Sequence, residues 1–195
     1  MSALPPDEFA DQVLIAAAPP ERVGEVVARL VGDEIKIGPM PVGRGELASA
    51  TAIGRRAAVR VAACADPDWH QVVTVPIDLS VSIDMAGRTA RYRGTVEVRT
   101  RLRLQLERPC TVTVHVDRVA PDDVQTSVQA IGLPARVLGW VGGIQETVAQ
   151  QVLDYVNDLI SSPRFETALH IDVPALLERA WEADLVVVVP EADED

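Results

Sequence analysis

The fold is decided by residues 71–131, which read QVVTVPIDLSVSIDMAGRTARYRGTVEVRTRLRLQLERPCTVTVHVDRVAPDDVQTSVQAI. Apolar and polar residues alternate along this stretch, first over 73–85 and then, with the opposite parity, over 95–107. A period of two is typical of a β-sheet that has one face in water and the other face buried. At about 3.3 Å per residue, a strand over 73–85 is about 43 Å long. The sequence therefore predicts long strands whose buried face is too large for a short helix to cover.

Shorter alternating stretches at 112–116 and 124–130 continue the sheet. The stretches are separated by short turn signals at 86–88, 108–109 and 121–123. Because short turns join neighbouring antiparallel strands, we expect a meander. Gly94 lies inside the second long strand, where a glycine favours a bend that lets the sheet coil.

A change of period after Pro134 predicts a long helix over 135–160. The apolar residues of one side of this helix are Val141, Ile144, Val148, Val152, Tyr155, Val156 and Leu159. A helix of about 24 residues is about 36 Å long. Because this length nearly matches that of the strands, we expect the helix to lie along the sheet and fill its curve.

The flanking segments predict smaller elements within a single domain over 1–195. On the N-terminal side we expect a loose arm over 1–11, a short strand over 12–17, an amphipathic helix over 21–31, turns with at most short strands over 38–54, and a strand over 57–64. On the C-terminal side we expect a short helix capped by Asp172 with Leu176, Leu177, Ala180 and Trp181 on its inner face, a buried or paired strand over 185–189, and an acidic tail over 191–195. The fold class predicted is α+β.

The composition narrows the class of protein. The chain has 195 residues, of which 48% are apolar and 24% charged, as in globular proteins with one ample core. Its 18 Lys and Arg against 29 Asp and Glu give a formal net charge of -11. This acidic balance argues against nucleic acid as a partner. The N-terminus does not read as a signal peptide and no run of eighteen apolar residues occurs, so we expect a cytoplasmic protein without a transmembrane segment.

Motifs for catalysis, metal binding or phosphate binding are missing from the sequence. His70, His115 and His170 have no Cys, Asp or Glu at ligand spacing. We therefore expect no metal, no cofactor and no enzymatic activity. Cys64 and Cys110 are predicted to be buried thiols, with a disulfide between neighbouring strands as the alternative.

One basic concentration stands out in this acidic chain. Five arginines occupy positions of the second long strand that should face solvent: Arg91, Arg93, Arg99, Arg101 and Arg103. We interpret this arginine stripe as a solvated face that pairs with Asp78, Ser80, Asp84 or Asp117 on neighbouring strands. The alternative is contact with lipid headgroups or with an acidic partner.

The order of elements resembles a known family. Long amphipathic strands followed by Val137-Leu-Gly-Trp-Val-Gly-Gly and a helix ending near Ile160 resemble the tubular lipid-binding (TULIP) superfamily over about 59–160. The resemblance implies a strongly curved antiparallel sheet around the long helix, with acyl chains held in the groove between them. The ligand-binding residues that it implies are Leu79, Val81, Ile83, Val98, Leu102, Leu104, Val114, Val116, Ile144, Val148 and Val152.

A second, weaker resemblance concerns the N-terminal part. Residues 13–27, VLIAAAPPERVGEVV, resemble the opening strand and first helix of START-like helix-grip proteins, which include polyketide cyclases. That resemblance also implies an apolar cavity under a long helix.

The function predicted from these patterns is non-enzymatic binding of a hydrophobic small molecule, lipid or fatty acyl chain. Two alternatives remain open. In one, the chain is an oligomer-forming module, such as a homodimer, that buries its apolar surfaces against a second subunit. In the other, it is a cyclase-like enzyme, for which the inward parity of the strands offers only Thr100 and Thr126 as mid-strand polar residues.

Overall fold

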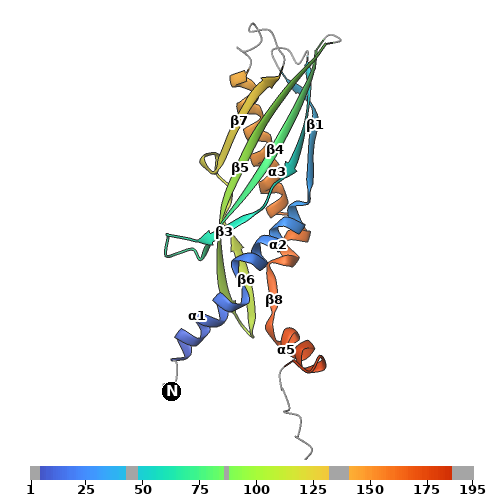
Figure 1. Cartoon of the computed structure of the whole chain (residues 1–195). Coiled ribbons are helices and arrows are strands. Elements are labelled where there is room, and N and C mark those ends of the chain that lie inside the picture. Colours follow the sequence, from blue (N-terminus) through green and yellow to red (C-terminus); the bar gives the residue numbers. More distant parts are fainter. Residues whose placement is uncertain (1–4, 43–47, 86–87, 132–140, 186–195) are drawn as a thin grey trace, which may run out of the picture.

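The computed structural model of the chain describes residues 5–42, 48–85, 88–131 and 141–185 (Figure 1). The elements in chain order are α1 (Pro6–Ala17), α2 (Pro20–Val31), β1 (Glu34–Val42), β2 (Ala48–Arg56), β3 (Arg60–Ala63), β4 (Gln71–Met85), β5 (Arg88–Glu107), β6 (Thr111–Val116), the 3₁₀ helix η2 (Pro121–Asp123), β7 (Val124–Ile131), α3 (Val141–Ile160), α4 (Pro163–Ala168), β8 (His170–Asp172) and α5 (Val173–Glu182).

The eight strands form one antiparallel sheet around the β4–β5 pair. These two strands pair along the whole of β4, from Gln71 opposite Leu102 to Met85 opposite Arg88. The path through the sheet is β1-β2-β4-β5-β6-β8, while β3 pairs with β4 and β7 with β5. The long strands predicted from the alternation are therefore confirmed, since β4 has 15 residues and β5 has 20.

The meander prediction is wrong at β7. Instead of pairing with β6, β7 pairs with the first part of β5, over 91–98, whereas β6 pairs with the last part, over 102–107. The physical reason is the length of β5, which offers one edge long enough for two short strands. The chain returns along that edge through η2.

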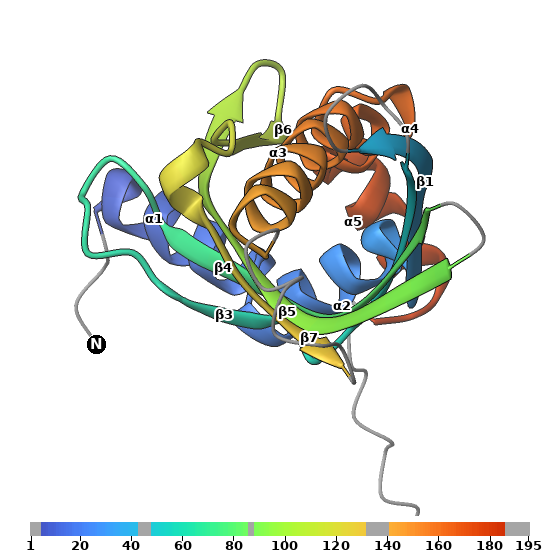
Figure 2. The same ribbon diagram turned by 90° about the horizontal axis from the view of Figure 1, so that it is seen from above.

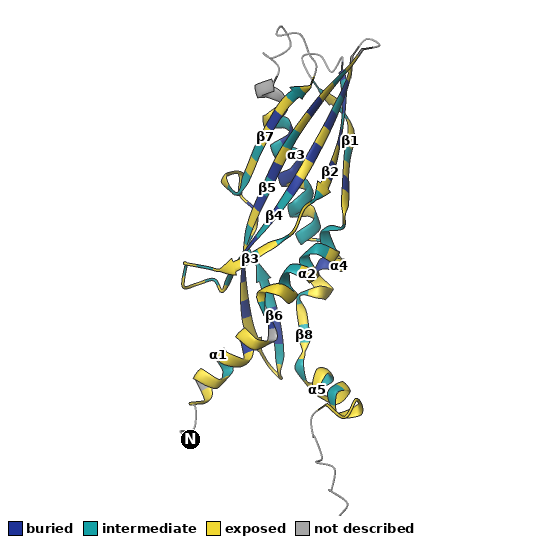
Figure 3. Ribbon diagram, viewed as in Figure 1, coloured by how far each residue is buried: buried dark blue, intermediate teal, exposed yellow. Residues whose placement is uncertain are grey.

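The sheet curves around α3, which lies inside the curve when the molecule is viewed from above (Figure 2). Alternate residues of β4, including Leu79, Val81 and Ile83, are buried and form one cluster with Val148 and Val152 of α3. Figure 3 shows the corresponding alternation of buried and exposed residues along β4 and β5. The α+β class, with a curved antiparallel sheet wrapped around a long helix, is confirmed.

Gly94 stands where β5 and β7 approach each other. A Cβ atom at this position would lie 2.1 Å from the carbonyl oxygen of Ser127 and 3.0 Å from the Cα of Val128. Both neighbours are backbone atoms, so neither can move aside without opening the strand pair. The glycine is needed here because of this close approach.

The amphipathic helix predicted over 21–31 is confirmed as α2, whereas the predictions for residues 6–17 are wrong. Residues 6–17 form α1 instead of the end of a loose arm followed by a strand, and Pro6 stands in the first helical turn, where proline is tolerated. Leu14 of α1 and Ala18, which follows the helix, are buried at a spacing of four, in a cluster with Leu104 and Val112. This spacing is that of a helix face, and it prevails over the short apolar run that favoured a strand.

The prediction of turns over 38–54 is also wrong, because this region contains the nine-residue strands β1 and β2. Pro39 and Pro41 of β1 and Gly54 of β2 are part of the sheet. β1 is an edge strand, where prolines are tolerated, and its register shifts between Ile37 and Met40. At Gly54 of β2, a Cβ would lie 2.8 Å from Cγ2 of Ile77, so the glycine makes room for a core side chain.

The C-terminal region is predicted only in part. The capping prediction is confirmed, since the Asp172 side chain accepts a hydrogen bond from the backbone N of Ala175 at 3.0 Å. The inner face predicted for this helix is wrong, because Leu176, Leu177 and Trp181 are exposed, the last at 57%. Elements α4 and β8 are absent from the predictions. The predicted strand over 185–189, except for the exposed Leu185, and the acidic tail lie outside the described residues.

The cysteine prediction is wrong as well. Cys64 is only half-buried and Cys110 is exposed, and both are free thiols, so the alternative disulfide is not formed. Within the described ranges, no helix is long and apolar enough to span a membrane. No group of three or more His, Cys, Asp or Glu side chains in the same ranges could hold a metal ion.

The arginine stripe lies on the exposed face of β5 and is partly ion-paired, as the solvated-face interpretation predicts. Arg101 pairs with Asp117 and, at 3.2 Å, with Asp66, while its guanidinium lies 5.1 Å from the centroid of the Trp69 ring. Arg99 pairs with Glu97 of its own strand at 2.8 Å. Of the predicted partners, the structure therefore pairs Asp117 with the stripe.

The ion pairs of Glu97 should make the stability of the fold depend on pH. The hydrogen bond from Arg99, together with Arg60, lowers the pKa of its carboxyl below the ordinary value of 4.5. A lowered folded-state pKa stabilises the fold above the unfolded-state pKa, and this contribution is lost as the pH falls through the folded-state value. Because solvent screens the pairs, Glu97→Gln should lower the free energy of unfolding by under about 1 kcal/mol at pH 7.

Urea unfolding at pH 7 and at pH 3 would check this prediction. The difference between Glu97→Gln and the wild type should shrink at the lower pH, where the carboxyl is protonated. Glu107→Gln, at an exposed position on the same strand, serves as the control. A stability difference that is the same at both pH values would contradict the lowered pKa of the Glu97 carboxyl.

Candidate ligand-binding site

Of three cavities that described residues line on the inner side of the sheet, the largest has a volume of about 130 Å³ and lies between α2, the C-terminal part of β5, β6, and the segment containing α4 and β8. Its apolar walls include Val23 and Val26 of α2 and Leu104 of β5. Arg22, His70 and Gln71 are the polar members of its lining. The cavity is thus an apolar space with a few polar groups, which is the usual composition of a ligand pocket.

Two smaller apolar cavities adjoin it along the sheet. The second, of about 60 Å³, has four lining residues in common with the first: Val27, Leu102, Val116 and Phe165. The third, of about 20 Å³, has four in common with the second: Ile35, Ile77, Tyr155 and Val156. The three spaces form a row from α2 to α3, which we call the inner groove.

The structure brings together seven of the eleven residues predicted for the ligand site. The residues that line the inner groove are Leu79, Val98, Leu102, Leu104, Val114, Val116 and Val152. Val81, Ile83 and Val148 are buried in the same core but do not line it. The side chain of Ile144 lies outside the described residues. Contact of any of these residues with a ligand stays a prediction.

Two walls of the groove were missed. One is the face of α2 that carries Val23, Val26, Val27 and Leu30, and the other is Phe165 of α4. The amphipathic pattern of α2 was visible in the sequence, but nothing in it showed which part of the sheet the helix covers. None of the described residues of α2 is fully buried, so this wall is loosely packed.

Two of the three polar residues of the largest cavity, His70 and Gln71, lie where β4 begins. Nε2 of Gln71 donates to the carbonyl oxygen of Ala18 at 2.7 Å, and Nδ1 of His70 accepts from the backbone N of Leu104 at 3.2 Å. Oε1 of Gln71 is buried and has no hydrogen-bond partner among the residues that the structure describes. This end of the groove therefore combines apolar walls with hydrogen-bonding capacity that the protein leaves unused.

The two inward threonines do not form a catalytic arrangement with each other. Oγ1 of Thr100 donates to the carbonyl oxygen of Asp117 at 2.8 Å, and Oγ1 of Thr126 is buried without a partner. Thr100 lines the second cavity, whereas Thr126 lines none of the three. The polar positions that the cyclase alternative requires are therefore not brought together.

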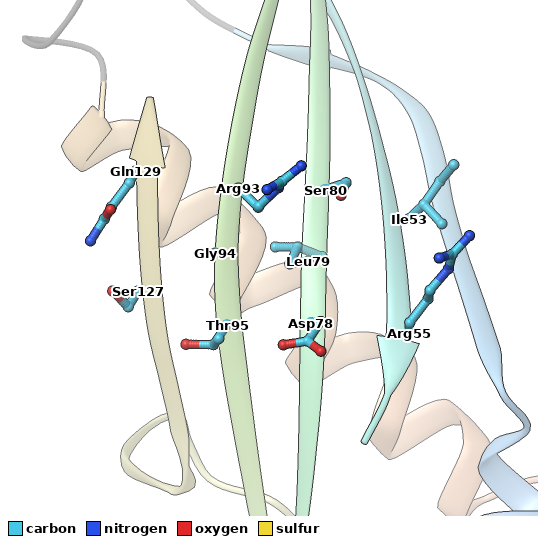
Figure 4. A pocket seen from close by; sticks show the side chains of 10 residues that line it. All are labelled: Ile53, Arg55, Asp78, Leu79, Ser80, Arg93, Gly94, Thr95, Ser127 and Gln129. Carbon is cyan, nitrogen blue, oxygen red and sulfur yellow. The ribbon is translucent and has the colours of Figure 1, made fainter. Parts of the chain in front are cut away.

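A larger depression of about 680 Å³ lies on the opposite, outer face of the sheet (Figure 4). Figure 4 shows that its lining comes from β2, β4, β5 and β7, and the residues are Ile53, Arg55, Asp78, Leu79, Ser80, Arg93, Gly94, Thr95, Ser127 and Gln129. It is open to solvent and mixed in character, with apolar side chains beside charges of both signs. We place the candidate site in the inner groove because its apolar walls are enclosed between helices and the sheet.

The topology agrees with what the TULIP resemblance implies. The chain has the curved antiparallel sheet around a long helix that this resemblance implies, whereas the opening strand implied by the helix-grip resemblance is part of α1. No protein-family model matches the chain, and no curated protein matches it. Among solved structures, the solution structure of latherin matches with 15% identity and a TM-score of 0.40, over 75% of this chain and 74% of that chain. Similarity at this level does not establish a family or a function. The fold class is therefore assigned from the topology of the sheet and helices.

Proposed function

We propose that the chain binds a hydrophobic molecule, a lipid or a fatty acyl chain, in the inner groove without transforming it. The observation that carries the proposal is the row of adjoining apolar cavities between the helices and the buried face of the sheet. Each square ångström of apolar ligand surface removed from water contributes about 25 cal/mol. The affinity therefore comes from the groove walls, and the polar end orients the ligand.

The ligand widens the groove when it enters. The largest cavity, at about 130 Å³, is smaller than the roughly 300–1,000 Å³ of pockets for drug-sized ligands. Helix α2 is one of the walls in which none of the described residues is fully buried. We therefore place the movement that admits the ligand in α2.

Two measurements test binding. The first is organic extraction of the natively purified protein followed by mass spectrometry, which should find a lipid at up to one molecule per chain. The second is fluorescence titration of the delipidated protein with cis-parinaric acid, which should saturate at a stoichiometry near one. An empty extract together with non-saturating fluorescence would overturn the proposal.

Locking α2 to the sheet should slow ligand entry. An ideal Cβ at Gly24 lies 3.6 Å from Cγ2 of Val61, so the two positions are in side-chain contact and suit a pair of cysteines designed to form a disulfide. In a background with both native cysteines replaced by serine, the oxidised Gly24→Cys/Val61→Cys protein should bind cis-parinaric acid at least about tenfold more slowly, because α2 can no longer swing away.

Stopped-flow fluorescence would check this prediction, and reduction with dithiothreitol should restore the rate. Gly24→Cys alone is the control and should be insensitive to reduction. An oxidised double variant with an unchanged association rate would show that the ligand enters without movement of α2.

A second candidate function is self-association, which the exposed apolar face of α5 favours. Leu177 and Trp181 are 53% and 57% exposed, and Leu185 is 76% exposed. Helix α1 lies at the same end of the molecule and exposes Phe9 and Ile15 (Figure 1). Sedimentation velocity at micromolar concentration should then detect a dimer that Trp181→Lys dissociates, and a monomer would remove this candidate.

A further inference from the structure

We propose that the inner groove selects apolar ligands that carry a hydroxyl group and that Gln71 recognises this group. The inference rests on the proposed function and adds the chemical class of the ligand. It comes from one end of the largest cavity, where β4 begins beside Ala18 at the end of α1.

The orientation of the Gln71 amide is fixed by its neighbour. Nε2 donates to the carbonyl oxygen of Ala18 at 2.7 Å. Because a carbonyl oxygen can only accept, a flipped amide would place two acceptors against each other. The atom left over is therefore Oε1, an acceptor.

Oε1 is buried, and none of the described residues donates a hydrogen bond to it. Buried polar atoms in folded proteins are almost always hydrogen-bonded, and one left unpaired costs free energy that a suitable donor recovers. Gln71 lines the cavity, so a ligand that widens the groove as proposed above can reach Oε1 and supply the donor. The walls around it are apolar, which makes a single donor group on a hydrocarbon the best complement.

His70 adds a matching donor. Its Nδ1 accepts from the backbone N of Leu104 at 3.2 Å, so a neutral imidazole carries its proton on Nε2. His70 lines the same cavity as Gln71. A hydroxyl group both donates and accepts, and it can therefore satisfy Gln71 and His70 together. An ether has no proton for Gln71, and a carboxylate would turn a negative oxygen towards another acceptor.

Arg22 gives the competing ligand class. It also lines the cavity, and its guanidinium would attract a fatty acid carboxylate. Its side chain is exposed, so this attraction is weakened by water, whereas the acceptor of Gln71 is buried. We therefore expect the groove to bind the alcohol more tightly than the acid.

The experiment measures displacement of cis-parinaric acid by three ligands with a ten-carbon chain: 1-decanol, 1-methoxydecane and decanoic acid. In the wild type, the alcohol should bind about tenfold more tightly than the ether, as expected for one hydrogen bond to a buried acceptor. It should also bind more tightly than the acid. Gln71→Leu should remove the preference for the alcohol over the ether while the ether still binds.

The readout is the ratio of the two affinities, which a general loss of structure at Gln71 would not change selectively. Gln71→Met is the second variant, because it keeps the length of the side chain without its acceptor. Gln105→Leu, at an exposed position on β5, is the control and should keep the wild-type ratio. Circular dichroism would show which variants are folded.

The outcomes separate the two proposals. Equal binding of alcohol and ether by the wild type, or a preference that survives in both Gln71 variants, would overturn the hydroxyl assignment and leave the proposed function standing. Tightest binding of the acid, lost in Arg22→Gln, would overturn it in favour of a carboxylate. Failure of all three ligands to displace the probe would count against both proposals.

Discussion

Gly94→Ala is expected to lower the free energy of unfolding by about 3 kcal/mol, at the upper end of what overpacking costs. The added Cβ would lie 2.1 Å from the carbonyl oxygen of Ser127, a distance that real side chains do not reach. Since the contact is with the backbone of β7, relief requires β5 and β7 to separate. Urea unfolding followed by circular dichroism would measure the loss.

Gly24→Ala in α2 is the matched control. A Cβ there meets only Cγ2 of Val61 at 3.6 Å and the carbonyl oxygen of Val59 at 3.9 Å, which are ordinary contacts. Alanine also favours a helix over glycine by up to about 1 kcal/mol, so this variant should be as stable as the wild type or more stable. Equal stability losses in the two variants would contradict the close approach described at Gly94.

Val27→Trp is expected to weaken binding of cis-parinaric acid by at least about a hundredfold. Val27 lines both the largest cavity and its neighbour, so an indole at this position occupies the space between them. Each tenfold loss corresponds to about 1.4 kcal/mol, and displacing an acyl chain from two cavities removes the burial of several methylene groups at about 0.8 kcal/mol each.

Glu25→Trp, at an exposed position on the same helix, is the control and should bind the probe like the wild type. Circular dichroism and the unfolding transition would establish that both variants are folded. If the folded Val27→Trp protein still binds the probe with wild-type affinity, the ligand does not occupy the inner groove.

The long strands and α3 could be predicted because their periods are sustained. Over 73–85 every second residue is apolar, and the same residues are the ones buried in β4, such as Val73 and Val81. Short segments gave no such signal. Residues 13–17 are apolar without a clear period, so they were assigned to a strand, although Leu14 and Ala18 pack as one face of a helical turn.

The pairing of β7 could not be predicted from local patterns. The turn signal at 121–123 marks a break in the chain but does not say which edge the next strand joins. That choice depends on β5, which is long enough to pair with β6 and β7 in succession. Gly54 wrongly suggested a turn for a related reason. A glycine is needed there because the side chain of Ile77, which is distant in sequence, packs against its backbone.

The sequence likewise predicted only part of the candidate site. Inward parity correctly placed Leu102 and Val116 on the groove wall, because alternation specifies the face of a strand. Alternation does not show how far along a strand the groove extends. The predicted ligand-binding residues therefore include Val81 and Ile83, which are buried in the core but do not line the groove. The unpaired acceptor of Gln71 was invisible in the sequence, because it depends on the hydrogen bond to Ala18, 53 positions away.

The most direct test of ligand binding is a methyl NMR titration of the delipidated protein, labelled at Leu and Val, with 1-decanol. We predict saturable shifts concentrated at Val27, Leu102, Leu104 and Val116, with intermolecular contacts from the alkyl chain to the same methyl groups. Shifts confined to residues outside the inner groove, or no saturable shifts at all, would contradict the account.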